Sequence, residues 1–181
     1  MSLDELLWLI SRAAALTAFF VLAASLITGQ ALRTAIFGPR LRNRELAGLH
    51  EFLTICWLPF VALHLIALTL DRVAQITPLD LVVPFRVPYA SLAVGLGTIG
   101  FDLLVVVALS SYLRSRLRPV AWRWLHRTSY VVFATFVVHA VLAGSDVTRS
   151  LILAPLAAVV SFLVITTLAR VLFGRTSGVE A

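Results

Sequence analysis

Residues 45–70 are ELAGLHEFLTICWLPFVALHLIALTL, a nearly uninterrupted apolar run that contains two histidines. A helix needs roughly 20 mostly apolar residues to cross the hydrocarbon core of a bilayer, so this run predicts a membrane-spanning helix. Four further runs of the same kind occur, each bounded by Gly, Pro or polar residues. We therefore expect an all-α integral membrane bundle of about five transmembrane helices, at residues 6–28, 45–70, 89–112, 121–143 and 151–173.

The overall composition also favours a membrane protein. Of the 181 residues, 60% are hydrophobic and 13% are charged. The apolar runs take up nearly the whole chain, so we expect one transmembrane domain over residues 1–181. Asp4 and Glu5 precede the first run and the positive charges follow it, the reverse of a secretory signal, so this run is expected to remain as a helix. The only cysteine, Cys56, excludes an internal disulfide and a multi-cysteine metal cluster.

Arginine is the signal for orientation, because cytoplasmic loops retain basic residues that exported loops lack. Arginines gather after the first run, around the start of the fourth and after the fifth: Arg33, Arg40, Arg42, Arg44, Arg114, Arg116, Arg118, Arg123, Arg127, Arg170 and Arg175. The opposite side has only Arg72, Arg86 and Arg149, offset by Asp71, Asp80 and Asp146. This pattern predicts an outside N-terminus and a cytoplasmic C-terminus. The same pattern explains the net charge of +6, because the arginines orient the protein in the lipid bilayer. We therefore expect no nucleic-acid partner.

The second and fourth helices then run in the same direction, and they contain all four histidines. His50 and His126 lie near the predicted cytoplasmic ends, and His64 and His139 lie about 20 Å further along at 1.5 Å per residue. Each depth thus offers one imidazole from each helix, the arrangement that binds a haem through two axial histidines. Met1 is the only methionine, so bis-histidine ligation is the expected haem chemistry.

Helical phase supports this arrangement fully on one helix only. The step from His50 to His64 returns to within roughly 40° of the same face, whereas the step from His126 to His139 misses by roughly 140° on a straight helix. A distorted fourth helix, or haems approached from different directions, would remove the mismatch.

The sequence around the histidines resembles a known family. WRWLHRTSY at 122–130, continuing to His139, and LHE at 49–51, continuing to His64, are similar to span signatures of the ferric reductase-like transmembrane domain. NADPH oxidases, ferric reductases and bacterial di-haem membrane cytochromes b share this domain. TPLDLVVPF at 77–85, followed by GLG at 95–97, is similar to the connecting region of its actinobacterial-type subgroup.

The resemblance covers about residues 6–173 and implies two haem b groups in a bacterial plasma membrane. His50 and His126 would bind the cytoplasmic-side haem iron, and His64 and His139 the outer one. The family's oxidases add a flavin- and nicotinamide-binding module, which has no counterpart here, so no flavin or NAD site is expected in this chain. Electrons would come from a separate flavoprotein or a quinol and pass to an outer-face acceptor such as a ferric chelate, dioxygen or a redox protein.

The chain also differs from the family between the haems. Related oxidases often have an aromatic residue where this chain has Val132. Phe133, Phe136 and Trp57 are the candidates to fill that gap, either as part of the electron route or as packing residues.

Three weaker signals remain. GLGTIG at 95–100 matches a dinucleotide-binding string, but that motif needs a preceding strand, so we interpret these glycines as sites of close helix packing. Asp102 lies well inside a span, where it would relay protons, accept a hydrogen bond from a ligand histidine or serve structure alone. Arg127, beside His126, is a candidate partner for a haem propionate, with lipid headgroups as the alternative. On the outer side, the candidate partners for a haem propionate are Arg72, Arg86 and Arg149.

The main expectation is therefore the transmembrane haem component of an oxidoreductase, which moves electrons from the cytoplasmic side to the outer face. Two alternatives stay open. A quinol-linked haem subunit of a periplasmic reductase system would be reduced by quinol without a flavoprotein. A haem-free structural or transport protein would be colourless when purified.

Overall fold

The computed structural model describes residues 1–32, 43–88, 90–147 and 149–172, and over these residues all regular secondary structure is helical. The helices are α1 (Leu3–Ala31), α2 (Asn43–Leu70), α3 (Ser91–Tyr112), η2 (Arg114–Arg116), α4 (Pro119–Arg127), α5 (Ser129–Ala143) and α6 (Ser150–Leu172). Helices α1, α2, α3, the α4–α5 segment and α6 are each long and apolar enough to cross a membrane. The prediction of an all-α protein with five spans is confirmed. The predicted features at Arg33, Arg40, Arg42, Tyr89, Phe173 and Arg175 lie outside the described residues.

Two helices begin at residues that favour a helix N-terminus. Ser2 and Glu5 form a capping box at the start of α1, since the Ser2 hydroxyl accepts from the Glu5 amide at 3.2 Å and the Glu5 carboxylate accepts from the Ser2 amide at 2.7 Å. Pro119 occupies the first turn of α4, where its missing N–H costs no helical hydrogen bond.

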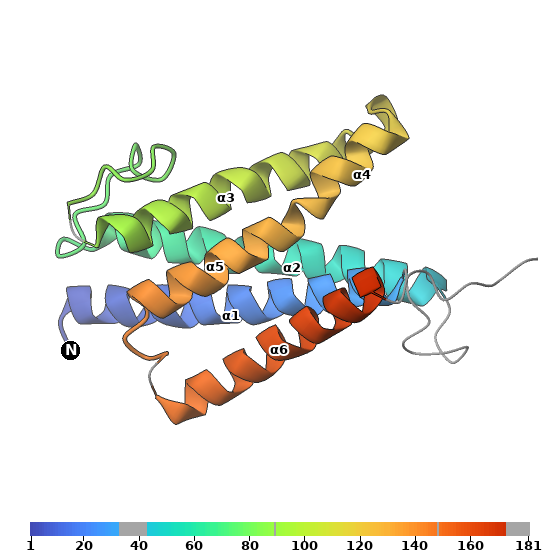
Figure 1. Ribbon diagram of the computed structural model, residues 1–181. Coiled ribbons are helices and arrows are strands. Elements are labelled where there is room, and N and C mark those ends of the chain that lie inside the picture. The colour runs from blue at the N-terminus through green and yellow to red at the C-terminus, as the bar shows by residue number, and fades with distance from the viewer. Residues whose placement is uncertain (33–42, 89, 148, 173–181) are drawn as a thin grey trace, which may run out of the picture.

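Successive spans are antiparallel (Figure 1). Helices α1 and α2 pack along each other, α3 packs on α4 and α5, and α6 packs against α1. As a result α2 and the α4–α5 segment run in the same direction, as the sequence predicts. The side of the membrane on which each end lies remains a prediction.

Two apolar clusters hold the bundle together, and α5 contributes to both. One cluster joins α1, α5 and α6 and includes Phe19, Phe133 and Leu163. The other joins α2, α3 and α5 through Trp57, Leu104, Val107 and Val132. Val132 has no exposed surface, so the centre of the bundle lies where α2, α3 and α5 meet.

The fourth span is two helices, which corrects the expectation of one helix over 121–143. Thr128 separates α4 from α5. Its amide donates to the Leu125 carbonyl at 3.2 Å, and its hydroxyl donates to the same carbonyl at 2.6 Å. This three-residue backbone bond and the added hydroxyl bond tighten the turn and distort the helix. The phase mismatch between His126 and His139 therefore does not apply, because the two residues lie on different helices.

Polar side chains within the spans are paired across helices. Gln30, near the end of α1, donates to the Thr167 hydroxyl at 2.7 Å and accepts from the Thr166 hydroxyl at 2.6 Å, both on α6. Meanwhile α2 exposes large apolar side chains such as Phe52 and Ile55, each about 60% exposed. Buried polar pairs and an apolar exterior are the pattern that hydrocarbon surroundings require.

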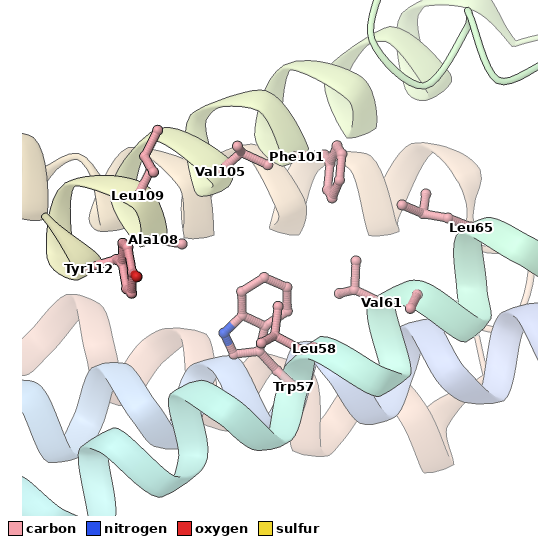
Figure 2. A pocket seen from close by; sticks show the side chains of 10 residues that line it. Trp57, Leu58, Val61, Leu65, Phe101, Val105, Ala108, Leu109 and Tyr112 are labelled. Carbon is pink, nitrogen blue, oxygen red and sulfur yellow. The ribbon is translucent and has the colours of Figure 1, made fainter.

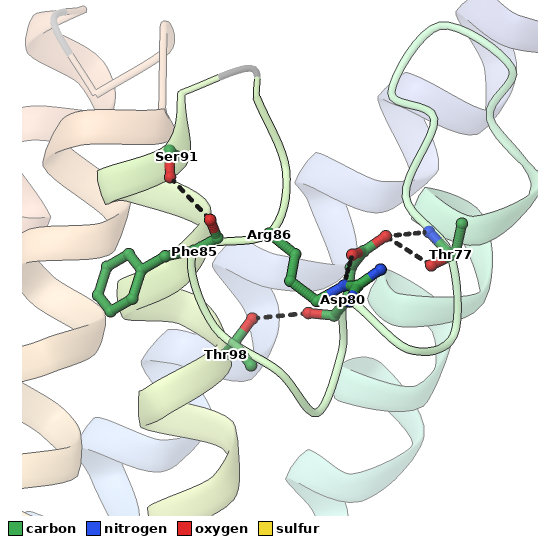
Figure 3. Close-up of polar contacts among 6 residues, drawn as sticks. All are labelled: Thr77, Asp80, Phe85, Arg86, Ser91 and Thr98. Carbon is green, nitrogen blue, oxygen red and sulfur yellow. Dashed lines mark hydrogen bonds and ion pairs between the residues drawn. The ribbon is translucent and has the colours of Figure 1, made fainter.

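The segment between α2 and α3 is fixed by Asp80 (Figure 3). The Asp80 carboxylate accepts from the Thr77 hydroxyl at 2.6 Å, the Thr77 amide at 2.9 Å and Arg86 Nε at 3.1 Å. The Asp80 carbonyl accepts from the Thr98 hydroxyl of α3 at 3.0 Å. The hydrogen bond from the Thr77 hydroxyl is the main reason that the pKa of Asp80 lies below its usual value.

Candidate functional site

Helix α1 orients both histidines of α2. His50 Nδ1 lies 2.8 Å from the carbonyl oxygen of Ser25, and His64 Nδ1 lies 3.0 Å from the carbonyl oxygen of Ser11. The hydroxyls of these serines also lie within hydrogen-bonding distance of the same nitrogens, at 3.1 Å and 2.9 Å. The two serines are spaced as the two histidines are, so the antiparallel α1–α2 pair repeats one contact at two depths.

Helix α3 does the same for the histidines of the fourth span. His139 Nδ1 on α5 lies 2.7 Å from the Ala93 carbonyl oxygen. His126 Nδ1 on α4 lies 3.3 Å from the Ser111 hydroxyl. Each of the four imidazoles is thus held by a neighbouring helix through Nδ1.

These contacts define the tautomer. A carbonyl oxygen only accepts, so Nδ1 of His50, His64 and His139 must bear the proton, and in a neutral ring this leaves the lone pair on Nε2. Within the described residues, all hydrogen bonds found for the side chains of these three histidines involve Nδ1. A histidine that donates through one nitrogen to a carbonyl is the usual form of a metal ligand that binds through the other.

Two of the histidines meet across the bundle. The rings of His50 and His126 have centroids 6.1 Å apart and an interplanar angle of 82°. Two imidazoles whose nitrogens each lie about 2 Å from one metal ion, on opposite sides of it, have centroids about 6 Å apart. The structure thus brings together His50 and His126, as the sequence predicts for one depth. The pairing of His64 with His139 remains a prediction.

Two glycines leave room for the rings. A Cβ atom on Gly97 of α3 would lie 2.8 Å from His139 Nδ1, and one on Gly29 of α1 would lie 3.2 Å from His50 Cε1. Gly97 belongs to the GLGTIG string, which lies entirely within α3. The string therefore has no strand before it, and its interpretation as a packing element is confirmed.

Trp57 lies on α2 midway between His50 and His64. Each histidine is seven residues away, about 10 Å along the axis and within about 20° of the same face. The indole is 4% exposed and packs with Val132 of α5. Its ring also lines an apolar groove of about 480 Å³ between α2 and α3 (Figure 2). Hydrocarbon, rather than a polar ligand, suits such a lining.

Phe133 and Phe136, the other aromatic candidates for the space between the haem sites, have different neighbours from Trp57. Phe133 stacks on Phe19 of α1 at 5.1 Å and so faces away from Trp57. Phe136 packs against both clusters and against Gly100. Asp102 accepts no hydrogen bond from a histidine, since these bonds go to the α1 and α3 groups named above.

The cationic candidates have varied partners. The Arg127 guanidinium lies 5.2 Å from the ring centroid of Trp124, and Arg86 pairs with Asp80. Arg149 lies 3.8 Å from Asp146. The Arg12 guanidinium lies 4.5 Å from the Trp8 ring centroid, and Arg12 also pairs with Asp146 at 2.6 Å.

Sequence reasoning missed the groups that orient the rings: Ser11, Ser25, Ala93 and Ser111.

Comparison of the chain with protein-family models, with curated proteins and with solved structures gave no significant match.

Proposed function

We propose that this protein is a transmembrane di-haem cytochrome b that moves electrons from a cytoplasmic-side donor to an acceptor on the outer face. The observation that supports this proposal is the set of four imidazoles on two co-directional spans, of which the rings of His50 and His126 meet with centroids 6.1 Å apart. Each ring is oriented through Nδ1 by a neighbouring helix. A hydrogen bond to the nitrogen that does not bind the metal fixes the orientation of a histidine ligand and strengthens it.

His50 and His126 would hold one haem, and His64 and His139 the other. The porphyrin would supply the four equatorial nitrogens, so two imidazoles complete the coordination of each iron. When bound, haem b carries one electron at a time, while the protein supplies ligation, spacing and a low dielectric.

The chain's own residues would set the distance and the medium between the two sites. The antiparallel α1–α2 pair separates His50 from His64 by about 21 Å along the axis. Trp57 and Val132 fill the middle of this separation and exclude water from it. We include Trp57 in the electron route because it is the large aromatic side chain on the histidine face of α2 at mid-depth.

The partners and location follow from the resemblance to the ferric reductase-like domain. The protein would reside in a bacterial plasma membrane with its arginine-rich end in the cytoplasm. A separate flavoprotein or a membrane quinol would donate electrons there. A ferric chelate, dioxygen or a redox protein would accept them outside. Reduction by a quinol analogue in the absence of any flavoprotein would identify the donor as quinol.

The test is a haem count on the purified protein with a reduced-minus-oxidised spectrum. We expect two protohaems per chain by pyridine haemochrome. His64→Ala or His139→Ala should remove one, and His50→Ala or His126→Ala the other, with partial recovery in added imidazole.

The matched control is Thr135→Ala. It removes an exposed hydroxyl one turn before His139 that bonds only to its own helix, so it should retain both haems. Colourless wild-type protein, or losses that pair the two histidines of one helix, would defeat the proposal.

A further inference from the structure

The indole nitrogen of Trp122 is a buried donor without an acceptor. In the part of the chain that the structure describes, it is the one buried side-chain nitrogen or oxygen that lacks a hydrogen-bond partner. Buried N–H groups without acceptors are rare, because leaving water without a replacement bond is costly. Such a group in a native protein indicates a missing partner.

Trp122 adjoins the first histidine pair. Its ring stacks on His126 with centroids 5.2 Å apart and planes at 24°, and His126 lies 6.1 Å from His50. Trp122 precedes His126 by one turn of α4, which puts it about 6 Å nearer the arginine-rich end of the bundle. The indole thus adjoins the two histidines that would hold one haem.

The charge around Trp122 selects an anion. The Arg114 guanidinium lies 4.3 Å from the Trp122 ring centroid. Residues 103–145 contain no Asp or Glu, whereas five exposed arginines lie on or just before α4: Arg114, Arg116, Arg118, Arg123 and Arg127. An indole N–H beside a guanidinium suits a carboxylate or phosphate oxygen.

We propose that Trp122 Nε1 donates a hydrogen bond to a propionate of the haem bound by His50 and His126, and that Arg114 provides the opposing charge. This inference rests on the proposed function. It assigns the propionate contact to Trp122 and Arg114, whereas the sequence pointed to Arg127, whose guanidinium lies over the exposed ring of Trp124.

The test uses the full-length protein and Trp122→Phe, which keeps an aromatic ring against His126 and removes only the donor. Trp124→Phe is the matched control, since Trp124 is on the same helix and 65% exposed. We expect one of the two haems of W122F to transfer to excess apomyoglobin at least about tenfold faster, as fits loss of a hydrogen bond to a charged group. The midpoint potential of that haem should also shift, and W124F should match wild type in both measurements.

A second measurement keeps the inference testable if W122F does not fold. Wild-type apoprotein is reconstituted with protohaem or with its dimethyl ester, in which neither propionate can be an anion. The ester should be released faster from the His50–His126 site, and Arg114→Gln should accelerate release of protohaem but not of the ester.

Each alternative outcome is distinct. Wild-type protein without haem would refute the proposed function itself. Two haems with W122F indistinguishable from W124F would refute only the propionate contact. If W122F lost bound phosphatidylglycerol in native mass spectrometry but kept wild-type haem release and potential, the acceptor would be a lipid phosphate and the inference would be overturned.

Discussion

Alanine at position 97 should selectively disturb the His64–His139 pair. A Cβ atom on Gly97 would lie 2.8 Å from His139 Nδ1 and Cε1, and ordinary van der Waals contact begins at 3.4 Å. The imidazole would therefore move by about 0.6 Å. Binding geometry tolerates displacements of about 0.5 Å, so this shift exceeds the limit. It also strains the 2.7 Å bond from His139 to the Ala93 carbonyl.

Alanine substitutions at two other glycines, Gly29 and Gly48, serve as graded comparisons for Gly97→Ala. A Cβ on Gly29 would lie 3.2 Å from His50 Cε1, so relief to 3.4 Å needs a shift of about 0.2 Å, within the tolerance. A Cβ on Gly48 of α2 would meet nothing within 4 Å. Since Gly→Ala within a helix otherwise stabilises by about 0.5–1 kcal/mol, Gly48→Ala should be neutral or slightly stabilising.

The assay is the haem content and reduced spectrum of the three variants after identical purification. Gly97→Ala should retain about one haem per chain and an intact His50–His126 site, and overpacking should cost about 1–3 kcal/mol of stability. Gly29→Ala should retain two haems with a small spectral shift, and Gly48→Ala should match wild type. Two normal haems in Gly97→Ala would show that the contact between α3 and His139 does not control this site.

Three further predictions concern other parts of the molecule. Trp57→Leu should keep both haems and lower stability by about 2–3 kcal/mol, less than the 3–5 kcal/mol of a Trp→Ala change. It should also slow electron transfer between the haems after flash reduction. An unchanged rate would exclude the indole from the electron route. The folded state lowers the pKa of Asp80, so the ionised carboxylate stabilises the fold above the usual aspartate pKa. This stabilisation is lost as pH falls through the lowered pKa. Residues 71–88 should therefore resist pepsin down to about pH 4. In Asp80→Asn the same segment should be cleaved throughout that range, and equal resistance would contradict the role of the Thr77 bonds. Asp146→Asn should lower stability by about 1–3 kcal/mol, between the values for exposed and buried ion pairs, and a double-mutant cycle with Arg12→Gln should recover most of this energy as coupling.

The sequence predicted the spans well because hydrocarbon allows few alternatives to a long apolar helix. It also predicted that His50 and His126 face each other, since co-directional spans bring residues at equal distances from their starts to equal depths. The break at Thr128 was not predictable in the same way. A threonine that bonds to the preceding turn is common in continuous helices, and only the structure shows that here it separates His126 from His139.

Some of the groups that orient the histidine rings could be found from the sequence, and others could not. Ser11 and Ser25 repeat the fourteen-residue spacing of His50 and His64, and this shared spacing on adjacent spans was a usable signal. The Ala93 carbonyl gave none, because every residue has a backbone oxygen and only packing determines which one meets His139. Phe133 was also ambiguous, since periodicity does not tell which neighbour an apolar helix faces when all its faces are apolar.

The two halves of the bundle differ in mechanical character. Helices α1 and α2 are each one unbroken helix, and their matched serine and histidine contacts recur at the same fourteen-residue interval. The other half has a joint at Thr128, and a rotation of α4 about this joint would change the angle of the His126 ring while leaving His139 in place. If the proposed haems are bound, substitutions near Thr128 should change the reduction potential of the His50–His126 site more than that of the other, because axial-ligand geometry is one of the few controls that a protein has over a bound iron.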